Sequence, residues 1–230
     1  MSVFIYAINI GTITLEQLKS LEPIISKDRQ ERAYKYKFDT DKIRCIIGEC
    51  IVRYALLKRY DLDNDKIIFR YSAYGKPYLP YASGIYFNIS HAGKWVVCAV
   101  SNRLVGIDIE QIKCDHLEIA KSFFTTYEYG RICSIRTEFE KYCEFYKLWT
   151  LKESYIKAIG VGLSKALNTF EFHEEHGVEY LYIEQQRVEQ YKFQSIRLSP
   201  DYQLSLCTEE IDTNNIEIVS LDELILFHMN

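Results

Sequence analysis

Two acidic residues near the middle of the chain, Asp108 and Glu110, have the type and spacing that can bind a metal ion. They lie in the segment VGIDIE, residues 105–110, in which apolar and acidic residues alternate. Such alternation predicts a β-strand whose residues i and i+2 share one face, which places the two carboxyl groups roughly 7 Å apart. Mg²⁺ prefers hard oxygen ligands and often takes only a few of them from protein. An ordinary half-buried strand has the same pattern, so the pair alone leaves both interpretations open.

A third acid, Glu153, lies in a helix predicted over residues 140–159. The core-facing stripe of this helix is Leu148, Leu151, Tyr155 and Ile159. Along the margin of the stripe, Trp149, Glu153 and Lys157 follow one another at four-residue intervals, so Glu153 is expected to project into a cleft. The alternative is a surface ion pair between Glu153 and Lys157. Two glycines, Gly160 and Gly162, are expected to end the helix, because glycine readily adopts the left-handed conformation.

Basic residues are densest between Ser26 and Arg44. They are Lys27, Arg29, Arg32, Lys35, Lys37, Lys42 and Arg44. Arginine suits bidentate contact with phosphate, which makes the segment a candidate phosphate-binding rim. The alternative is a solvated helix face, because acidic residues are interspersed. Apolar spacing over residues 43–57 predicts a long core helix capped by Asp39 or Thr40, and an anion near Arg44 would then also meet the helix dipole.

Two turns carry further polar groups. A turn is predicted at Tyr74-Gly75-Lys76-Pro77, because Gly and Pro favour turns. In a functional role, the backbone of this turn would approach a flat ring while Lys76 faces a phosphate. Two strands over residues 86–90 and 95–100 form a predicted hairpin, whose turn is expected to present Ser90 and His91 as hydrogen-bond donors. Ordinary polar turns remain the alternative for both segments.

Other elements position these residues. Further strands are predicted at residues 3–8, 67–70, 170–172, 179–183, 191–198 and 203–207, and helices at 117–124 and 221–229. The helix at 117–124 is expected to turn Leu117, Ala120, Phe123 and Phe124 inward. Thr125 or Thr126 is expected to cap a short helix that contains Glu128. Glu128 itself is expected to be a capping or surface residue.

Composition narrows the class of protein. The 230 residues are 48% hydrophobic and 26% charged, which is typical of a globular domain or of two small lobes. The net charge of −4 argues against a general nucleic-acid binder. Seven scattered cysteines lack metal-binding spacing, and no apolar run approaches a membrane span, so a reducing cytoplasm is expected.

Four motifs together resemble one family. YGKP at 74–77, FNISH at 87–91, GIDIE at 106–110 and WTLKESYIK at 149–157 have the order and spacing of the 4′-phosphopantetheinyl transferases of the larger, surfactin-synthetase-activating type. The resemblance extends from about Arg29 to about Ser164. This chain departs from the family pattern at two places. The family often has a Pro and a Lys in the segment where this chain has Lys27 and Arg29, and it often has the sequence HSG where this chain has His91-Ala92-Gly93.

This resemblance implies a reaction and a site. Phosphopantetheine would move from coenzyme A to a serine of a carrier protein domain, with release of adenosine 3′,5′-bisphosphate. The resemblance makes Asp108, Glu110 and Glu153 the Mg²⁺ ligands, Glu153 also the general base, and Lys157 a phosphate contact that assists the leaving group. It assigns the phosphates of coenzyme A to Arg29, Arg32, Arg44, Ser90 and His91, and the border of the adenine pocket to Lys76 and Pro77.

The implied fold is α+β, with two similar lobes related by pseudo-two-fold symmetry at residues 1–104 and 105–230. Implied partners are coenzyme A and the carrier domains of peptide synthetases, polyketide synthases or fatty acid synthases, in pathways such as antibiotic biosynthesis. Phe123, Phe124 and the segment after them are the expected docking surface, and a monomer is expected. Two alternatives stay open: a Mg²⁺-dependent phosphodiesterase or nuclease, and a non-catalytic coenzyme A-binding module.

Overall fold

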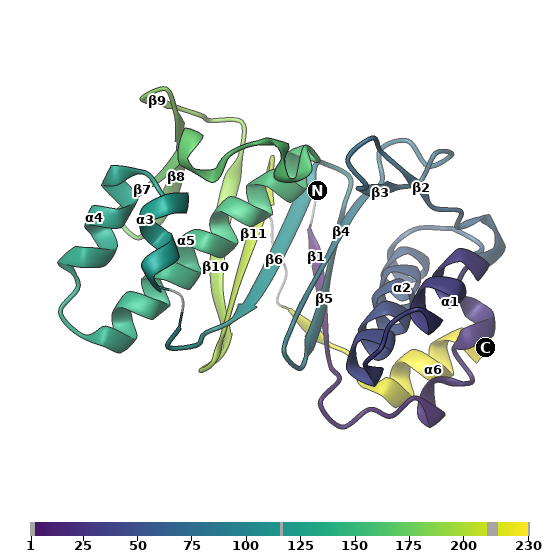
Figure 1. The fold of residues 1–230 in the computed structure, drawn as a ribbon. Coiled ribbons are helices and arrows are strands. Elements are labelled where there is room, and N and C mark those ends of the chain that lie inside the picture. The colour runs from purple at the N-terminus through teal and green to yellow at the C-terminus, as the bar shows by residue number, and fades with distance from the viewer. Residues whose placement is uncertain (1–2, 116, 211–215, 230) are drawn as a thin grey trace. The chain divides into compact units, whose positions relative to one another are not determined.

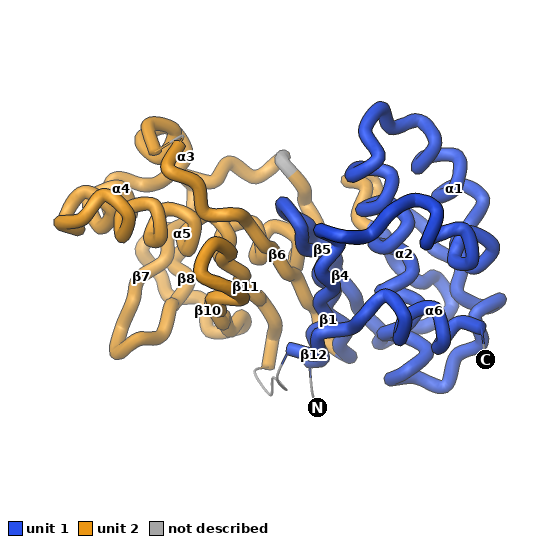
Figure 2. Tube along the Cα trace, turned by 90° about the horizontal axis from the view of Figure 1, so that it is seen from below, with its two compact units in different colours: residues 1–71, 77–102, 212–230 blue, residues 72–76, 103–211 orange. Residues whose placement is uncertain are grey.

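A computed structural model describes residues 3–115, 117–210 and 216–229. The chain divides into two compact units (Figure 2): unit 1 has residues 1–71, 77–102 and 212–230, and unit 2 has residues 72–76 and 103–211. The division near residue 103 lies close to the expected one at 104/105. The C-terminal segment, however, was expected in the second lobe and belongs to unit 1, because strand β12 (Glu217–Ile218) pairs with strand β1 (Phe4–Asn9).

Unit 1 is built on a four-stranded sheet in the order β12-β1-β5-β4. Strands β5 (Trp95–Ser101) and β4 (Tyr86–Ala92) form a hairpin, β1 is antiparallel to β5, and β12 is parallel to β1. The long helix α2 (Asp39–Arg59) packs on this sheet, and α1 (Lys27–Tyr34) and α6 (Leu221–Met229) pack on α2. A small hairpin of β2 (Arg70–Tyr71) and β3 (Pro77–Tyr78) completes the unit.

Helix α2 forms because its apolar residues recur at helical spacing, and the predicted stripe is buried in the core of unit 1. The helix begins at Asp39 with Phe38 at the N-cap and no side-chain capping bond, so the predicted cap at Asp39 or Thr40 is wrong. The predicted strand at residues 67–70 reduces to Arg70, which opens β2.

Unit 2 is built on a three-stranded antiparallel sheet in the order β10-β11-β6 (Figure 1). Its strands are β6 (Val105–Gln111), β10 (Lys192–Ser199) and β11 (Tyr202–Thr208), and a second sheet has β7 (Glu171–Glu175), β8 (Val178–Ile183) and β9 (Gln186–Arg187). Helix α5 (Glu138–Ile159) packs on β6 and β11, and α3 (Ala120–Phe123) and α4 (Thr126–Ser134) precede it. The α+β class is confirmed.

The helix predicted at 140–159 is α5, which starts two residues earlier because Thr137 caps it. Its predicted stripe is buried at Leu148, Leu151 and Tyr155, and Gly160 ends it with a φ of 72°. The helix predicted at 117–124 is instead a short 3₁₀ turn, Leu117–Ile119, followed by α3. Phe123, predicted to face inward, is 44% exposed.

In the described ranges, no helix is long and apolar enough to cross a membrane.

The hairpin of β4 and β5 is longer than predicted, because β4 continues to Ala92 and leaves Gly93 and Lys94 as its turn. Ser90 and His91 therefore lie in the strand, opposite Val97 and Val96, and the prediction that the turn presents them is wrong.

Candidate active site

Strand β6 lies directly against the backbone of helix α5 at Gly106. A methyl group added at Gly106 would lie 2.0 Å from the carbonyl oxygen of Ser154 and 2.4 Å from the amide nitrogen of Ala158. No real Cβ atom approaches backbone so closely, so this contact requires glycine. Because alternate strand residues share a face, Asp108 and Glu110 are directed to the same side as Gly106, which is the side of α5.

Asp108 and Lys157 join the two elements through an ion pair. The Lys157 ammonium donates to Oδ1 of Asp108 at 2.6 Å. Asp108 is only 3% exposed, whereas the side chain of Lys157 is 27% exposed. A short contact to a buried carboxylate is a strong, charge-assisted hydrogen bond, which sets the spacing of β6 and α5 at this level.

Glu110 and Glu153 both have raised pKa values. Burial is the main cause for Glu110, and the neighbouring Asp108 adds to it, so that the pKa rises to about 7 although Lys157 opposes the shift. Burial and Asp108 likewise raise the pKa of Glu153, again against Lys157. The three carboxyl groups therefore interact with one another, and Lys157 acts on all three of them.

The chemistry of these residues fits a hard divalent cation. Three carboxylates that repel one another lose that repulsion when a cation binds between them. As the side chains stand, no group of three or more Asp, Glu, His or Cys residues in the described ranges is arranged to hold a metal. The Lys157 ammonium instead balances the charge of Asp108. The donor set is present, and the ammonium competes with any cation for Asp108.

A second, fully buried ion pair fixes helix α5. Lys152, the residue before Glu153, donates to Glu128 at 2.8 Å and to the carbonyl oxygens of Leu167 and Phe170 at 2.8 and 2.5 Å. Glu128 also accepts from the amide of Phe172 at 3.0 Å and closes a capping box on α4 with Thr125. The predicted capping role of Glu128 is confirmed, but its surface position is wrong, since it is fully buried.

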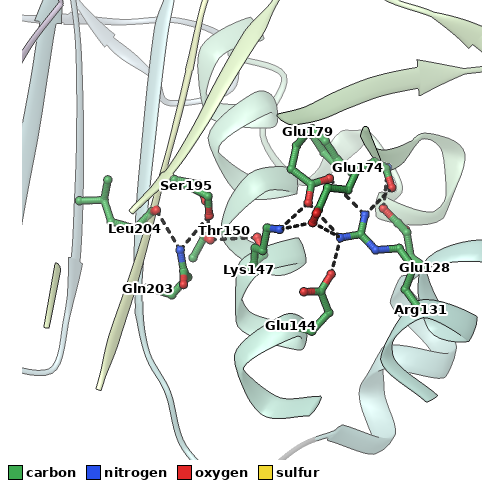
Figure 3. Close-up of polar contacts among 12 residues, drawn as sticks. Glu128, Arg131, Glu144, Lys147, Thr150, Glu174, Glu179, Ser195, Gln203 and Leu204 are labelled. Atoms are coloured by element: carbon green, nitrogen blue, oxygen red, sulfur yellow. Dashed lines mark hydrogen bonds and ion pairs between the residues drawn. The ribbon is translucent and has the colours of Figure 1, made fainter. Parts of the chain in front are cut away.

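The N-terminal half of α5 is held by a cluster of charges around Arg131 (Figure 3). Arg131 donates to both carboxylate oxygens of Glu179, at 2.9 and 3.1 Å, and to Glu144. Lys147 of α5 lies 2.6 Å from Glu179 and 2.8 Å from Glu174. Burial tends to raise the pKa of Glu179, but the hydrogen bonds from Arg131 and Lys147 outweigh it and lower the pKa. These contacts join α4, α5 and β8.

In unit 1, the arginines predicted to bind phosphate have protein partners. Nε of Arg29 donates to Glu49 at 3.2 Å, and Glu49 also accepts from Arg53 at 2.9 Å. Arg44 donates to the carbonyl oxygen of Gly93 at 2.6 Å, and so contacts the turn of the β4–β5 hairpin. Arg32 donates to the hydroxyl of Tyr36 at 3.3 Å at an exposed position. Two cations around Glu49 leave a net positive charge there.

Lys76, Pro77, Ser90 and His91 lie in less uniform surroundings. Ser90 is buried and His91 is exposed, as expected of successive strand residues that point to opposite faces. Pro77 opens β3 opposite Tyr71 and is half-buried. The Lys76 ammonium donates to carbonyl oxygens of unit 2. The phosphate and adenine contacts assigned to these residues stay predictions.

The structure brings Asp108, Glu110, Glu153 and Lys157 together in unit 2. Arg29, Arg32, Arg44, Pro77, Ser90 and His91 belong to unit 1. Sequence reasoning missed the contact of Gly106 with α5 and the pair of Lys152 and Glu128. In the sequence, Gly106 and Lys152 are a glycine inside a regular strand and a lysine inside a regular helix. This signal is too weak to indicate either contact.

Comparison with known proteins gives consistent matches over both units. Residues 12–103 match the model of the 4′-phosphopantetheinyl transferase N-terminal family, and residues 104–207 match that of the 4′-phosphopantetheinyl transferase superfamily. The chain is 36% identical to 4′-phosphopantetheinyl transferase gsp of Aneurinibacillus migulanus, over 86% of this chain and 81% of that protein.

Two further relatives match most of the chain. It is 33% identical to 4′-phosphopantetheinyl transferase Sfp of Bacillus subtilis, over 93% of this chain and 95% of that protein. It is also 33% identical to 4′-phosphopantetheinyl transferase psf-1 of Bacillus pumilus, over 91% of this chain and 90% of that protein.

Proposed function

Because this chain belongs to the 4′-phosphopantetheinyl transferase superfamily and is an Sfp-like 4′-phosphopantetheinyl transferase, we propose that it moves phosphopantetheine from coenzyme A to a serine of a carrier protein domain. The reaction uses Mg²⁺ and releases adenosine 3′,5′-bisphosphate. The observation that carries this proposal is the interacting set of Asp108, Glu110, Glu153 and Lys157 where β6 meets α5.

Asp108, Glu110 and Glu153 would hold the Mg²⁺. The raised pKa values of Glu110 and Glu153 support this role, because burial and repulsion between neighbouring carboxylates disfavour their ionised forms in the absence of a cation. When bound, Mg²⁺ would neutralise charge on the pyrophosphate of coenzyme A during attack.

Glu153 is the proposed general base. In the transfer, the serine oxygen forms a bond to the β-phosphorus of coenzyme A, and the bond from that phosphorus to the bridging oxygen of the adenosine bisphosphate breaks. The serine proton passes to Glu153, directly or through water. Burial raises the pKa of Glu153, and a carboxylate with a raised pKa accepts a proton more readily. A bound cation would work in the opposite direction, because it makes the carboxylate a weaker base.

Lys157 is the proposed contact to the phosphate that leaves. Its ammonium is partly exposed and is held by Asp108, so it is positioned without being enclosed. In unit 1, Arg29, Arg32 and Arg44 supply positive charge for the phosphates of coenzyme A. Ser90 and His91 would donate to phosphate, and Lys76 and Pro77 would border the adenine.

Carrier domains of peptide synthetases, polyketide synthases or fatty acid synthases are the proposed protein substrates, with roles that include antibiotic biosynthesis. Phe123 remains a candidate docking residue, since its ring is exposed. Phe124 is buried and packs on Phe145, so its side chain is not available to contact a carrier domain. All seven cysteines are free, which supports a reducing cytoplasm, and we propose a monomer.

The test incubates the protein with an apo carrier domain, coenzyme A and Mg²⁺ and measures the intact mass of the carrier. We expect a gain of one phosphopantetheine on serine, loss of transfer with excess EDTA, and loss in Glu153→Gln and Asp108→Ala. Lys192→Met is the control variant, because the side chain of Lys192 on β10 is 40% exposed and forms an ion pair with the exposed Glu189. Retained transfer in both acid variants would refute the roles given to these acids.

The same assay separates the alternatives. A phosphodiesterase would hydrolyse coenzyme A or DNA in the presence of Mg²⁺ without any carrier domain. A binding module would retain coenzyme A and turn over none of it. Competition among purified carrier domains then identifies the preferred substrate.

A further inference from the structure

Lys76 lies at the end of a tightly bonded turn. Residues 72–76 connect β2 to β3 and are counted with unit 2. Within the turn, the Ser72 amide donates to the carbonyl of Lys76 at 2.9 Å, and the Lys76 amide donates to Oγ of Ser72 at 3.1 Å. The amide of Gly75 also donates to the carbonyl of Ser72, at 2.9 Å. These bonds fix the backbone from which the Lys76 side chain leaves.

The Lys76 ammonium donates to three backbone carbonyls. Its distances are 2.6 Å to the oxygen of Lys157, 2.8 Å to that of Ala158 and 3.3 Å to that of Val105. An ammonium has three N–H groups, so these three acceptors use all of them. No N–H group is then left for a phosphate oxygen.

Two of these acceptors lie at the C-terminus of α5. The last hydrogen bond of the helix runs from the amide of Gly160 to the carbonyl of Ile156, so the carbonyls of Lys157 and Ala158 lie beyond it. A cation at this end also interacts favourably with the helix dipole. The stem of Lys76 passes over Gly160, where an added methyl would lie 3.1 Å from Cδ of Lys76.

The third acceptor, Val105, is the first residue of β6. One cation thus connects the end of the helix that carries Glu153 and Lys157 with the start of the strand that carries Asp108. The residue after Val105 is Gly106, which contacts the α5 backbone. Lys76 and Gly106 together set the position of β6 along α5.

We propose that Lys76 is a positioning residue for the transfer reaction: its ammonium holds the end of α5 against the start of β6, which keeps Lys157 and Glu153 aligned with Asp108. This inference rests on the proposed function, and it replaces the phosphate contact assigned to the Lys76 side chain. Burial lowers the pKa of Lys76 to about 8, so the charged form with three donors predominates at neutral pH.

The test compares Lys76→Met with the wild type in three measurements. Methionine keeps the apolar stem and removes the donors. We expect kcat to fall by about tenfold to a hundredfold, because small misplacements of catalytic groups have effects of this size. We expect the Kd for coenzyme A, measured by calorimetry, to change by less than about twofold, because methionine keeps the apolar stem that would border the adenine and the ammonium is bonded to carbonyls of the protein. Amide hydrogen exchange at residues 157–160 should accelerate, while exchange in α2 stays unchanged.

Chemical rescue separates a missing ammonium from general damage. In Lys76→Cys, reaction with 2-bromoethylamine restores an ammonium at nearly the length of lysine, and kcat and slow exchange should return. Wild type treated in the same way is the control, because Cys114 and Cys133 are exposed and will also react.

Two results would overturn the proposal. One is a Kd for coenzyme A that rises tenfold or more at unchanged kcat, which makes Lys76 a direct ligand. The other is a variant that matches the wild type in all three measurements. If Lys76→Met does not fold, Lys76→Arg is decisive: we expect lower kcat at unchanged Kd, and unchanged kcat with weaker binding contradicts the proposal. A wild-type protein without transfer activity refutes the proposed function instead, and hydrogen exchange still tests the contact.

Discussion

The contact between Gly106 and helix α5 gives the sharpest prediction for mutation. In Gly106→Ala the new methyl would lie 2.0 Å from the Ser154 carbonyl oxygen, whereas ordinary contact begins at 3.4 Å, so β6 and α5 must separate by the difference of 1.4 Å. Both atoms that the methyl meets belong to backbone, so no rotation of a side chain can relieve the overlap.

Two effects follow from this separation. Forced overpacking of a core costs about 1–3 kcal/mol, and this overlap lies at the upper end, so we expect the free energy of unfolding to fall by about 3 kcal/mol. The ion pair between Lys157 and Asp108, now 2.6 Å, would open beyond hydrogen-bond distance. A displacement of about 1 Å between catalytic groups can cost about a hundredfold in rate, so we expect a loss of that size in kcat at saturating coenzyme A.

Urea unfolding and the carrier mass assay measure the two effects. The matched control is Gly130→Ala in the middle of α4, where an added methyl meets nothing within 4 Å. That substitution should stabilise the protein by about 0.5–1 kcal/mol, because alanine favours a helix over glycine, and should leave transfer unchanged. Wild-type stability and activity in Gly106→Ala would refute the close approach of β6 to α5.

Three further predictions concern stability. Glu128→Gln should lower the free energy of unfolding by about 3–5 kcal/mol in urea, since it leaves the buried Lys152 charge unpaired, and Glu128→Gln with Lys152→Met should recover part of that loss. Glu179 has a lowered pKa in the folded protein, so its contribution to stability is present above the unfolded pKa of 4.5 and is lost as the pH falls below that value. Glu179→Gln should therefore flatten the dependence of the urea midpoint on pH between pH 6 and 3. An unchanged slope of the urea midpoint against pH contradicts this role. Tyr54→Phe removes a hydroxyl that donates to Glu223 at 2.6 Å and accepts from Lys58 at 2.7 Å, and should destabilise unit 1 by about 1–2 kcal/mol, with faster proteolysis of α6 than in the wild type.

Regular elements with a strong period were predictable from the sequence. The apolar stripe of α5 and the alternation in β6 depend only on local spacing, and both elements were found with bounds within two residues. The grouping of Asp108 with Glu153 required the family resemblance, because no local pattern brings residues of a strand and a distant helix together.

The errors arose where distant contacts decide the outcome. Ser90 and His91 were expected in a turn, but cross-strand pairing with Val97 and Val96 continues β4 through both of them. Phe123 fits an inward pattern by spacing alone, yet the helix breaks into two short pieces and its ring remains exposed. Glu128 looked like an ordinary cap, because its partner Lys152 lies on another helix.

The parallel pairing of β12 with β1 has a consequence for the order of folding during synthesis. Residues 217–218 leave the ribosome only after all of residues 103–211, so unit 1 lacks an edge strand and α6 until unit 2 has already emerged. Contacts between such distant parts of a chain form slowly, because a long loop must close first. We therefore expect unit 2 to reach its native structure first on the ribosome, while the nascent unit 1 exposes to chaperones the face of α2 that α6 covers.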